Sequence, residues 1–183
     1  MCTPVGHSLL GYSIVKSDKT FTIQRRWMLI LTVLVLANLP DMDYLFGAVT
    51  GFPNKYHQTW THSLVFVTGV SLLIGLGWML IQHTFSWKLT GIVFFILLSH
   101  LVLDMLGNDS RPPFGIQLFW PFSKKHVLSP ISIFRGVKKA SENHRFLKAL
   151  FSWGNLKTVG LEVLILGPVA CWTFFQNKKK IRP

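Results

Sequence analysis

Charged residues are scarce in this chain of 183 residues, and acidic ones are the scarcest. Only 14% of the residues are charged, whereas a soluble domain has about 25%. Half of the residues are hydrophobic, which excludes intrinsic disorder because enough apolar surface exists to offset the entropy lost on ordering. The two cysteines, Cys2 and Cys171, lie at opposite ends of the chain, which excludes a disulfide-stapled scaffold. Seven acidic against nineteen basic residues leave a net charge of +12, typical of proteins that bind nucleic acid or an anionic membrane surface.

Long apolar runs favour the membrane. Ser63–Ile81 contains nineteen residues without a charge, and as a helix it reaches roughly 28 Å, about the thickness of the hydrocarbon layer. One such run alone also fits a helix buried in a soluble core. Two further runs have the same character, Trp87–Leu106 and Thr158–Phe175, the latter interrupted only by Glu162. A basic tail at 178–182 follows and suits lipid headgroups.

Two N-terminal segments are shorter. Trp27–Leu39 is apolar over thirteen residues, about 20 Å as a helix. It is either a span that begins near Phe21 or a half-span. Thr3–Val15 predicts a short helix lying against the bundle, with Thr3 as its N-cap and Pro4 in its first turn. This segment lacks the basic region and cleavage site of a signal peptide.

Between Gly107 and Lys157 the composition changes. This stretch holds nine Lys or Arg residues and four prolines, which predicts a basic loop on the membrane surface. Its later part, Ser132–Leu150, is predicted to be an amphipathic surface helix, with a basic face of Arg135, Lys138, Lys139, Arg145 and Lys148. We therefore expect an all-α integral membrane bundle with three or four spans. It is expected to be one domain over 1–183, divided into 1–26 (N-terminal helix and basic linker), 27–106 (helical core), 107–157 (basic surface loop) and 158–183 (last span and tail).

Histidine and aspartate gather in three segments that border the predicted spans. One pair follows 27–39, one pair precedes the span that begins at Ser63, and His100 and Asp104 share a helix face near the end of the next span. The topology returns all three segments to the same membrane face. Imidazole and carboxylate ligands together suit Zn, Mn or Fe(II). The candidate ligands, with His7 added if the N-terminal helix packs nearby, are His7, Asp41, Asp43, His57, His62, His100 and Asp104.

Each of these residues also has a structural interpretation. His100 and Asp104 fit a helix-stabilising hydrogen bond or a proton relay, and the aspartates after Pro40 fit a turn. His57 fits a solvated loop, and His62 an interfacial helix start. Their convergence on one face favours a shared site, because ionisable groups near the membrane interior are costly without a partner. The other histidines are predicted to be solvated or interfacial, namely His83, His126 and His144.

These motifs resemble the YdjM family of bacterial inner-membrane proteins, described as membrane-bound metal-dependent hydrolases. The matching blocks cover about residues 1–130. They are His7 after Thr-Pro, Leu-Pro-Asp-Met-Asp at 39–43, His-x-x-x-Thr-His-Ser at 57–63, Ser-His-Leu-x-Leu-Asp at 99–104 and Gly-Ile-Gln-Leu-Phe-Trp-Pro-Phe-Ser at 115–123. The resemblance implies the same seven residues as metal ligands. The chain departs from the family pattern at 57–59, where His-Gln-Thr replaces His-Arg-Gly. The missing arginine removes a cation for an anionic substrate, and Arg111, Lys124 and Lys125 are the candidates to replace it.

The first functional hypothesis is metal-assisted hydrolysis of an anionic phosphoester or lipid at the membrane surface. Asp43 or Asp104 would accept a proton or orient a ligand histidine, and Arg111, Lys124 and Lys125 would attract the substrate. We expect one or two divalent ions, most simply Zn, with Mn or Fe as alternatives. The expected location is the bacterial inner membrane, and the expected partners are the bilayer, its anionic lipids and an amphiphilic or phosphorylated substrate.

Two alternatives use the same residues differently. A metal or solute transporter would use the His/Asp cluster as a transit site, and a structural membrane protein would use it as a polar network. No sequence repeat of the transporter kind is evident. Nucleic acid is not an expected partner, because no helix-turn-helix, zinc-finger or stacking motif accompanies the basic residues.

Overall fold

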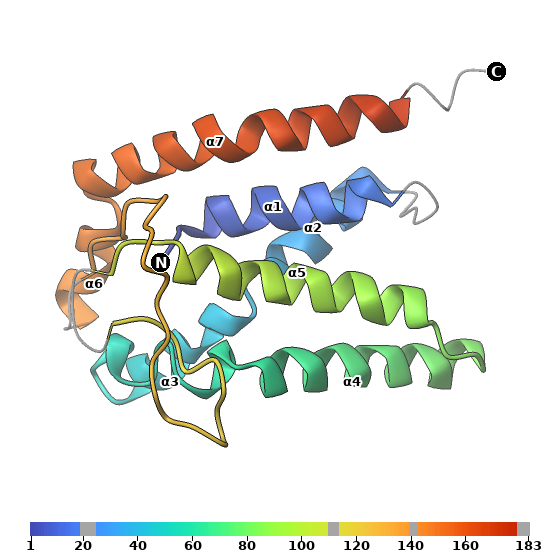
Figure 1. Ribbon diagram of the computed structural model, residues 1–183, viewed down its shortest axis with the longest axis horizontal. Coiled ribbons are helices and arrows are strands. Elements are labelled where there is room, and N and C mark those ends of the chain that lie inside the picture. The colour runs from blue at the N-terminus through green and yellow to red at the C-terminus, as the bar shows by residue number, and fades with distance from the viewer. Residues whose placement is uncertain (19–24, 110–113, 140–142, 179–183) are drawn as a thin grey trace.

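The protein is an all-α bundle whose longer helices run roughly side by side (Figure 1). The computed structural model describes residues 1–18, 25–109, 114–139 and 143–178, apart from the side chains of 143, 144, 146, 147, 177 and 178. Its helices are α1 (Pro4–Ser17), α2 (Arg26–Ala37), α3 (Asp43–Val49), α4 (Leu64–Gln82), α5 (Trp87–Met105), α6 (Asn143–Leu150) and α7 (Trp153–Lys178). Single 3-10 turns are η1 (Pro40–Met42), η2 (Pro53–Lys55) and η3 (Trp60–His62).

The three predicted spans are confirmed. Helices α4, α5 and the Trp153–Gln176 part of α7 are long and apolar enough to cross a membrane. Helix α4 begins at Ser63, whose hydroxyl accepts the Phe66 N–H, and α5 begins at Ser86, whose hydroxyl accepts the Leu89 N–H. Much of α4 faces outward with large apolar side chains, which suits contact with lipid, among them Leu72, Leu73, Leu76, Leu80 and Ile81.

The segment Trp27–Leu39 does not form one straight span. Helix α2 ends at Ala37, and Pro40 opens η1, because proline has no N–H to donate to the carbonyl one turn before it. The following Pro40–Val49 stretch is bent from α2 by 63°. The bundle therefore has three spans, or four if the bent pair is counted as one. The bend places two aspartates, Asp41 and Asp43, where the chain turns.

The N-terminal helix exists as predicted, but it lies inside the bundle. Helix α1 packs against α7, α5 and α2 (Figure 1). Thr3 stands at the N-cap position and Pro4 in the first turn, as predicted, although the Thr3 side chain makes no capping hydrogen bond. The carboxylate of Glu162 on α7 takes that role instead, accepting the N–H of Thr3 at 2.7 Å, the N–H of Gly6 at 3.1 Å and the Thr3 hydroxyl. An acid from the last helix thus caps the first one.

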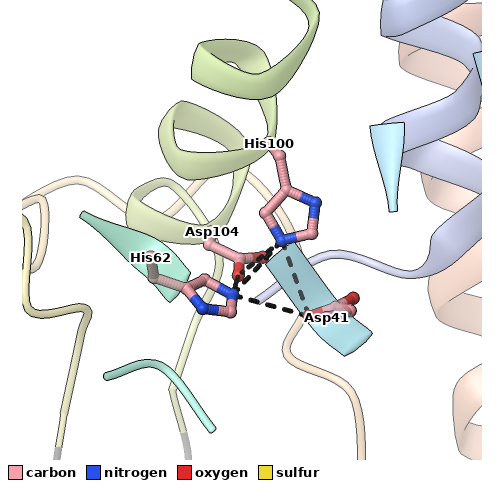
Figure 2. Close-up of side chains that lie close together, drawn as sticks. All are labelled: Asp41, His62, His100 and Asp104. Atoms are coloured by element: carbon pink, nitrogen blue, oxygen red, sulfur yellow. Dashed lines mark hydrogen bonds and ion pairs between the residues drawn. The ribbon is translucent and has the colours of Figure 1, made fainter. Parts of the chain in front are cut away.

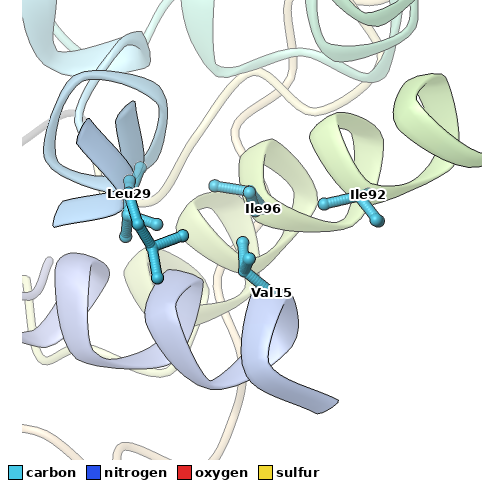
Figure 3. Packing of buried hydrophobic residues seen from close by; sticks show 6 residues of the cluster. Val15, Leu29, Ile92 and Ile96 are labelled. Atoms are coloured by element: carbon cyan, nitrogen blue, oxygen red, sulfur yellow. The ribbon is translucent and has the colours of Figure 1, made fainter. Parts of the chain in front are cut away.

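An apolar cluster joins α1, α2 and α5 and extends up to the turn of α5 that carries His100. It contains Val15, Leu29, Val33, Ala37, Ile92 and Ile96, and Figure 3 shows four of these side chains meeting between the three helices. Gly11 permits this close approach, since a Cβ there would lie 3.1 Å from the Ala37 Cβ. Small residues at such contacts let membrane helices pack at short range.

The loop after α5 corrects the predicted surface helix, which begins at Asn143 and not at Ser132. Residues 132–139 form an irregular segment that pairs with the end of α5. The Ile133 N–H donates to Leu106 O at 2.9 Å, and the Asn108 N–H donates to Phe134 O at 2.9 Å. Phe134 is buried with Leu103 and Leu166. Tertiary packing of this aromatic side chain prevails over the helical composition of the stretch, so the proposed basic face does not form before α6.

Candidate metal centre

The His/Asp segments meet at one end of the bundle. His100 and Asp104 lie in the last two turns of α5, Asp41 lies in η1 at the bend, and His62 ends η3 just before α4. Figure 2 shows these four side chains pointing toward one another from three separate segments. The predicted convergence on one face of the bundle is therefore what the structure shows for these residues.

Four ligand-type atoms surround one point. His62 Nε2 lies 3.3 Å from His100 Nε2, 3.5 Å from Asp41 Oδ1 and 3.4 Å from Asp104 Oδ2. His100 Nε2 lies 3.5 Å from each of the same two carboxylate oxygens. Zinc–ligand bonds of 2.0–2.1 Å in a regular tetrahedron place neighbouring ligands about 3.3–3.4 Å apart. The five distances between these atoms, 3.3–3.5 Å, lie close to that spacing, and we call the four residues the tetrahedral set.

The hydrogen bonding of the two carboxylates supports the same conclusion. Asp41 Oδ1 and Asp104 Oδ2 are buried and have no hydrogen-bond partner among the described residues. Buried acceptors are normally satisfied, and an unsatisfied one needs an explanation such as an ion. The two unsatisfied oxygens are the same atoms that complete the tetrahedral set, so the four residues fit a divalent metal ion.

Both histidines are held so that Nε2 is the free ligand atom. His100 Nδ1 lies 2.7 Å from the Ala37 carbonyl, to which it donates as Nδ1–H. His62 Nδ1 lies 3.4 Å from Asp43 Oδ2 and 3.0 Å from the Thr61 hydroxyl. In metal-binding histidines, a hydrogen bond from the ring nitrogen that does not bind the metal fixes the tautomer and the ring orientation.

Asp43 contacts His57, Gln58 and Thr61, residues that lie next to the cluster. Its Oδ1 lies 2.9 Å from His57 Nδ1, and its Oδ2 accepts the Gln58 N–H at 3.2 Å and the Thr61 hydroxyl at 2.8 Å. Asp43, His57 and His62 form a second group that could hold a metal, but that group shares His62 with the first. One neutral imidazole offers one lone pair, so the contacts favour a single ion, with Asp43 orienting the histidines.

His57 lies beside the tetrahedral set. Its Nδ1 is 3.7 Å from Asp41 Oδ1, its Nε2 is 3.0 Å from Met1 Sδ, and Tyr44 stacks on its ring at 4.1 Å. Burial, together with the positive charge of Lys139, lowers the pKa of His57 to about 4. Its imidazole is therefore neutral at pH 7 and can accept a proton or a metal.

His7 reaches the cluster from α1, as expected, and contacts its outer side. Its ring stacks on His100 with centroids 3.7 Å apart, and its Nε2 lies 3.3 Å from Asp104 Oδ1. The Cys2 N–H donates to the same Asp104 oxygen at 3.1 Å. These contacts hold the Asp104 carboxylate with Oδ2 facing the two ligand histidines. His7 thus contacts the set of four through His100 and Asp104, and its role as a metal ligand stays a prediction.

Two of the predicted substrate-binding cations, Lys124 and Lys125, are not brought to the cluster. Lys124 and Lys125 are exposed in the loop before His126, and Arg111 lies outside the described residues. Position 58, where the family pattern has arginine, does not face the cluster either. The Gln58 side chain donates to Asp109 at 3.2 Å.

Sequence reasoning missed the cation that does lie near the cluster. Lys139 and Asp41 line the same cavity of about 670 Å³, together with Tyr44. Lys139 Nζ lies 5.4 Å from the centre of the Tyr44 ring, and burial lowers the pKa of Lys139 while Asp41 and Asp104 act in the opposite direction. The sequence pattern places Lys139 on the basic face of an amphipathic surface helix. Glu162 was missed as well, although a lone carboxylate in an apolar span is itself a signal.

The fold and the site define a multi-pass helical membrane protein with a buried His/Asp group that could hold a metal ion. The family model of the YdjM inner membrane protein matches residues 1–179, so the chain belongs to the YdjM family, whose members are inner membrane proteins. No curated protein and no solved structure matches the chain.

Proposed function

We propose that the protein is a metal-dependent hydrolase that acts on an anionic phosphoester at the membrane surface. The observation that carries this proposal is that the tetrahedral set reaches the wall of a cavity through Asp41. A purely structural metal site is closed, whereas a catalytic one is open to water or substrate. His62, His100, Asp41 and Asp104 would hold the ion, most simply Zn, since mixed imidazole and carboxylate ligands suit it.

Each residue of the site then has a defined task. A divalent ion bound by the four residues would supply Lewis acidity, and it would lower the pKa of a water that joined them as a fifth ligand toward about 7. Lys139 attracts the negative charge of the phosphoester. His57, held at Nδ1 by Asp43, takes the proton of the attacking water at Nε2. The water oxygen bonds to phosphorus, the ester P–O bond breaks, and the proton passes to the departing alkoxide to give an alcohol and a phosphate.

A transport function for the same cluster has less support. The cluster lies at one end of the bundle, and α4 continues from it as nineteen residues without a charged side chain. A transport path needs polar groups through the depth of the membrane, usually on broken helices. Uptake of labelled zinc into proteoliposomes that depends on His62 would favour transport over hydrolysis.

The proposal is tested by metal content and phosphodiesterase activity together. We expect detergent-purified protein to contain about one equivalent of metal by elemental mass spectrometry and to hydrolyse bis(p-nitrophenyl) phosphate. His62→Ala and His100→Ala should lose both properties. His83→Asn is the matched control, because it removes an imidazole at the other end of α4 where the backbone has a positive φ that asparagine tolerates. A folded wild type that binds no metal after reloading with Zn or Mn would contradict the proposal.

A further inference from the structure

The cavity beside the cluster has an apolar wall. It lies between the start of α1, the segment 137–139 and the junction of α6 with α7, and its volume of about 670 Å³ is in the range of ligand pockets, about 300–1,000 Å³. Its apolar lining includes Val5, Val137, Phe151, Trp153, Leu156 and Val159. A phosphate group gains nothing from contact with apolar side chains, whereas a hydrocarbon chain would bury its apolar surface against them.

Among the described residues that line this cavity, charged side chains belong to Asp41 and Lys139. Asp41 belongs to the tetrahedral set, so Lys139 shares the cavity with a ligand of that set. The backbone beside Lys139 is fixed by Asn155, whose side chain accepts the Lys138 N–H at 2.7 Å and donates to Lys138 O at 2.9 Å. The cavity therefore combines an apolar wall with a held cationic side chain next to the metal centre.

The position of the cavity gives it access to the bilayer. The first turn of α7, which lines the cavity, lies at the same end of the bundle as the start of α4 and the end of α5 (Figure 1). Phe151 and Trp153 line the cavity and are also largely exposed, at 88% and 70%. Exposed aromatic residues at the ends of spans lie at the membrane interface, at headgroup depth.

We propose that this cavity binds the hydrocarbon chain of a membrane lipid with a phosphate headgroup, and that Lys139 holds the phosphate next to Asp41 and its metal. The inference rests on the proposed function and names its substrate class. Lys139 thus takes the role that the sequence had assigned to Arg111, Lys124 and Lys125. Lys139 and a cation held by Asp41 would both attract the phosphate, and the hydrocarbon chain accounts for the apolar wall.

Chain binding is tested without relying on catalysis. An alkylphosphonate with a diazirine near the end of its chain is bound to metal-free and zinc-loaded protein in nanodiscs, photolysed and mapped by mass spectrometry. We expect crosslinks within 150–159 that unlabelled alkylphosphonate competes away. Val159→Trp should abolish them by filling the cavity, while Leu164→Trp, on the exposed side of the same helix, should not. Crosslinks spread over the exposed face of α4, without competition, would overturn the inference.

A separate variant tests the proposed contact between Lys139 and the phosphate. Lys139→Met keeps a long apolar side chain and removes the charge. It should lower the competed crosslink yield at limiting probe about tenfold or more, because a charge-assisted hydrogen bond is lost. Lys124→Met is the control with an exposed lysine, and it should leave the yield unchanged. Equal yields from both variants would remove Lys139 from the proposed site.

Hydrolysis separates this inference from the proposed function. Hexyl p-nitrophenyl phosphate should be cleaved with a kcat/KM at least about tenfold above that of the methyl ester, since more apolar surface is buried in the cavity. Val159→Trp should remove this preference and leave cleavage of the methyl ester. Metal-dependent cleavage without any chain preference would overturn the lipid assignment and leave the hydrolase. Competed crosslinks without cleavage of either ester would overturn the hydrolase and leave a lipid-phosphate binding site.

Discussion

Different kinds of interaction hold the two ends of the bundle together, hydrogen bonds at one end and apolar packing at the other. At the cluster end, nearly every polar atom of Asp43, His62 and His100 has a directional partner. At the other end, α1, α2 and α5 meet through aliphatic side chains such as Leu29, Ile92 and Ile96 (Figure 3). In a bilayer these aliphatic contacts gain little from the hydrophobic effect, because lipid tails are equally apolar. Close packing stabilises that end, and hydrogen-bond geometry defines the cluster end.

This difference predicts how each end responds to mutation. A polar end held by specific atoms should fail when one acceptor is removed, even if volume is kept. An apolar end held by packing should tolerate changes that keep its volume. Three substitutions test this contrast, in order of decreasing effect.

The largest effect is expected from Glu162→Ala. This substitution leaves the N–H groups of Thr3 and Gly6 without their acceptor, at about 1–3 kcal/mol for each unsatisfied group. Thermal unfolding in detergent measures the loss. Glu162→Gln retains one carbonyl oxygen as an acceptor and should lose less stability. Equal stability of the alanine variant and the wild type would show that α1 is held by its other contacts.

Asp43→Asn should weaken metal binding by about 10–100-fold, because it removes a carboxylate that orients a ligand histidine. Competition with a chelator of known affinity measures the change. Asp109→Asn is the matched control, because Asp109 contacts the same loop through Gln58 and is not among the residues of either metal-binding group. If both variants bind metal as tightly as the wild type, Asp43 does not position His62.

Ile96→Val should have the smallest effect. It removes one buried methylene from the cluster of α1, α2 and α5, at about 0.5–1.5 kcal/mol, and should leave metal affinity unchanged. Thermal unfolding and chelator competition on the same preparation measure both quantities. A large loss of metal affinity here would show that the two ends are coupled and would contradict the contrast.

The spans and the convergence of the cluster could be predicted because they depend on local patterns. An uncharged run of nineteen residues predicts α4, and the four-residue spacing of His100 and Asp104 predicts one helix face. The order of spans then brings Asp41 and His62 to the same end of the bundle. The roles within the cluster could not be predicted, because whether Asp43 binds a metal or orients His62 depends on where its oxygens point.

The incorrect predictions share a different cause. Lys139 was assigned to a helix because 132–150 has helical composition, yet Phe134 packs against residues of α5 and α7 and Lys138 is bonded to Asn155. Such contacts join residues far apart in the sequence, and local propensity carries no information about them. Thr3 is the N-cap residue as predicted, but the partner of its hydroxyl, an acid 159 positions away, could not be predicted from local sequence.

The contact of Glu162 with the start of α1 also bears on the order in which the molecule is assembled. The chain is synthesised from its N-terminus, so the N–H groups of Thr3 and Gly6 emerge long before their acceptor. The Cys2 N–H is likewise synthesised well before its acceptor, the Asp104 carboxylate. Until α7 has entered the membrane, the first helix lacks its cap, and the contacts that hold Asp104 in place depend on that helix. The last helix therefore provides the acceptor that caps the first helix. A chain that ends before residue 162 would lack this cap, and its His/Asp cluster would be incompletely supported.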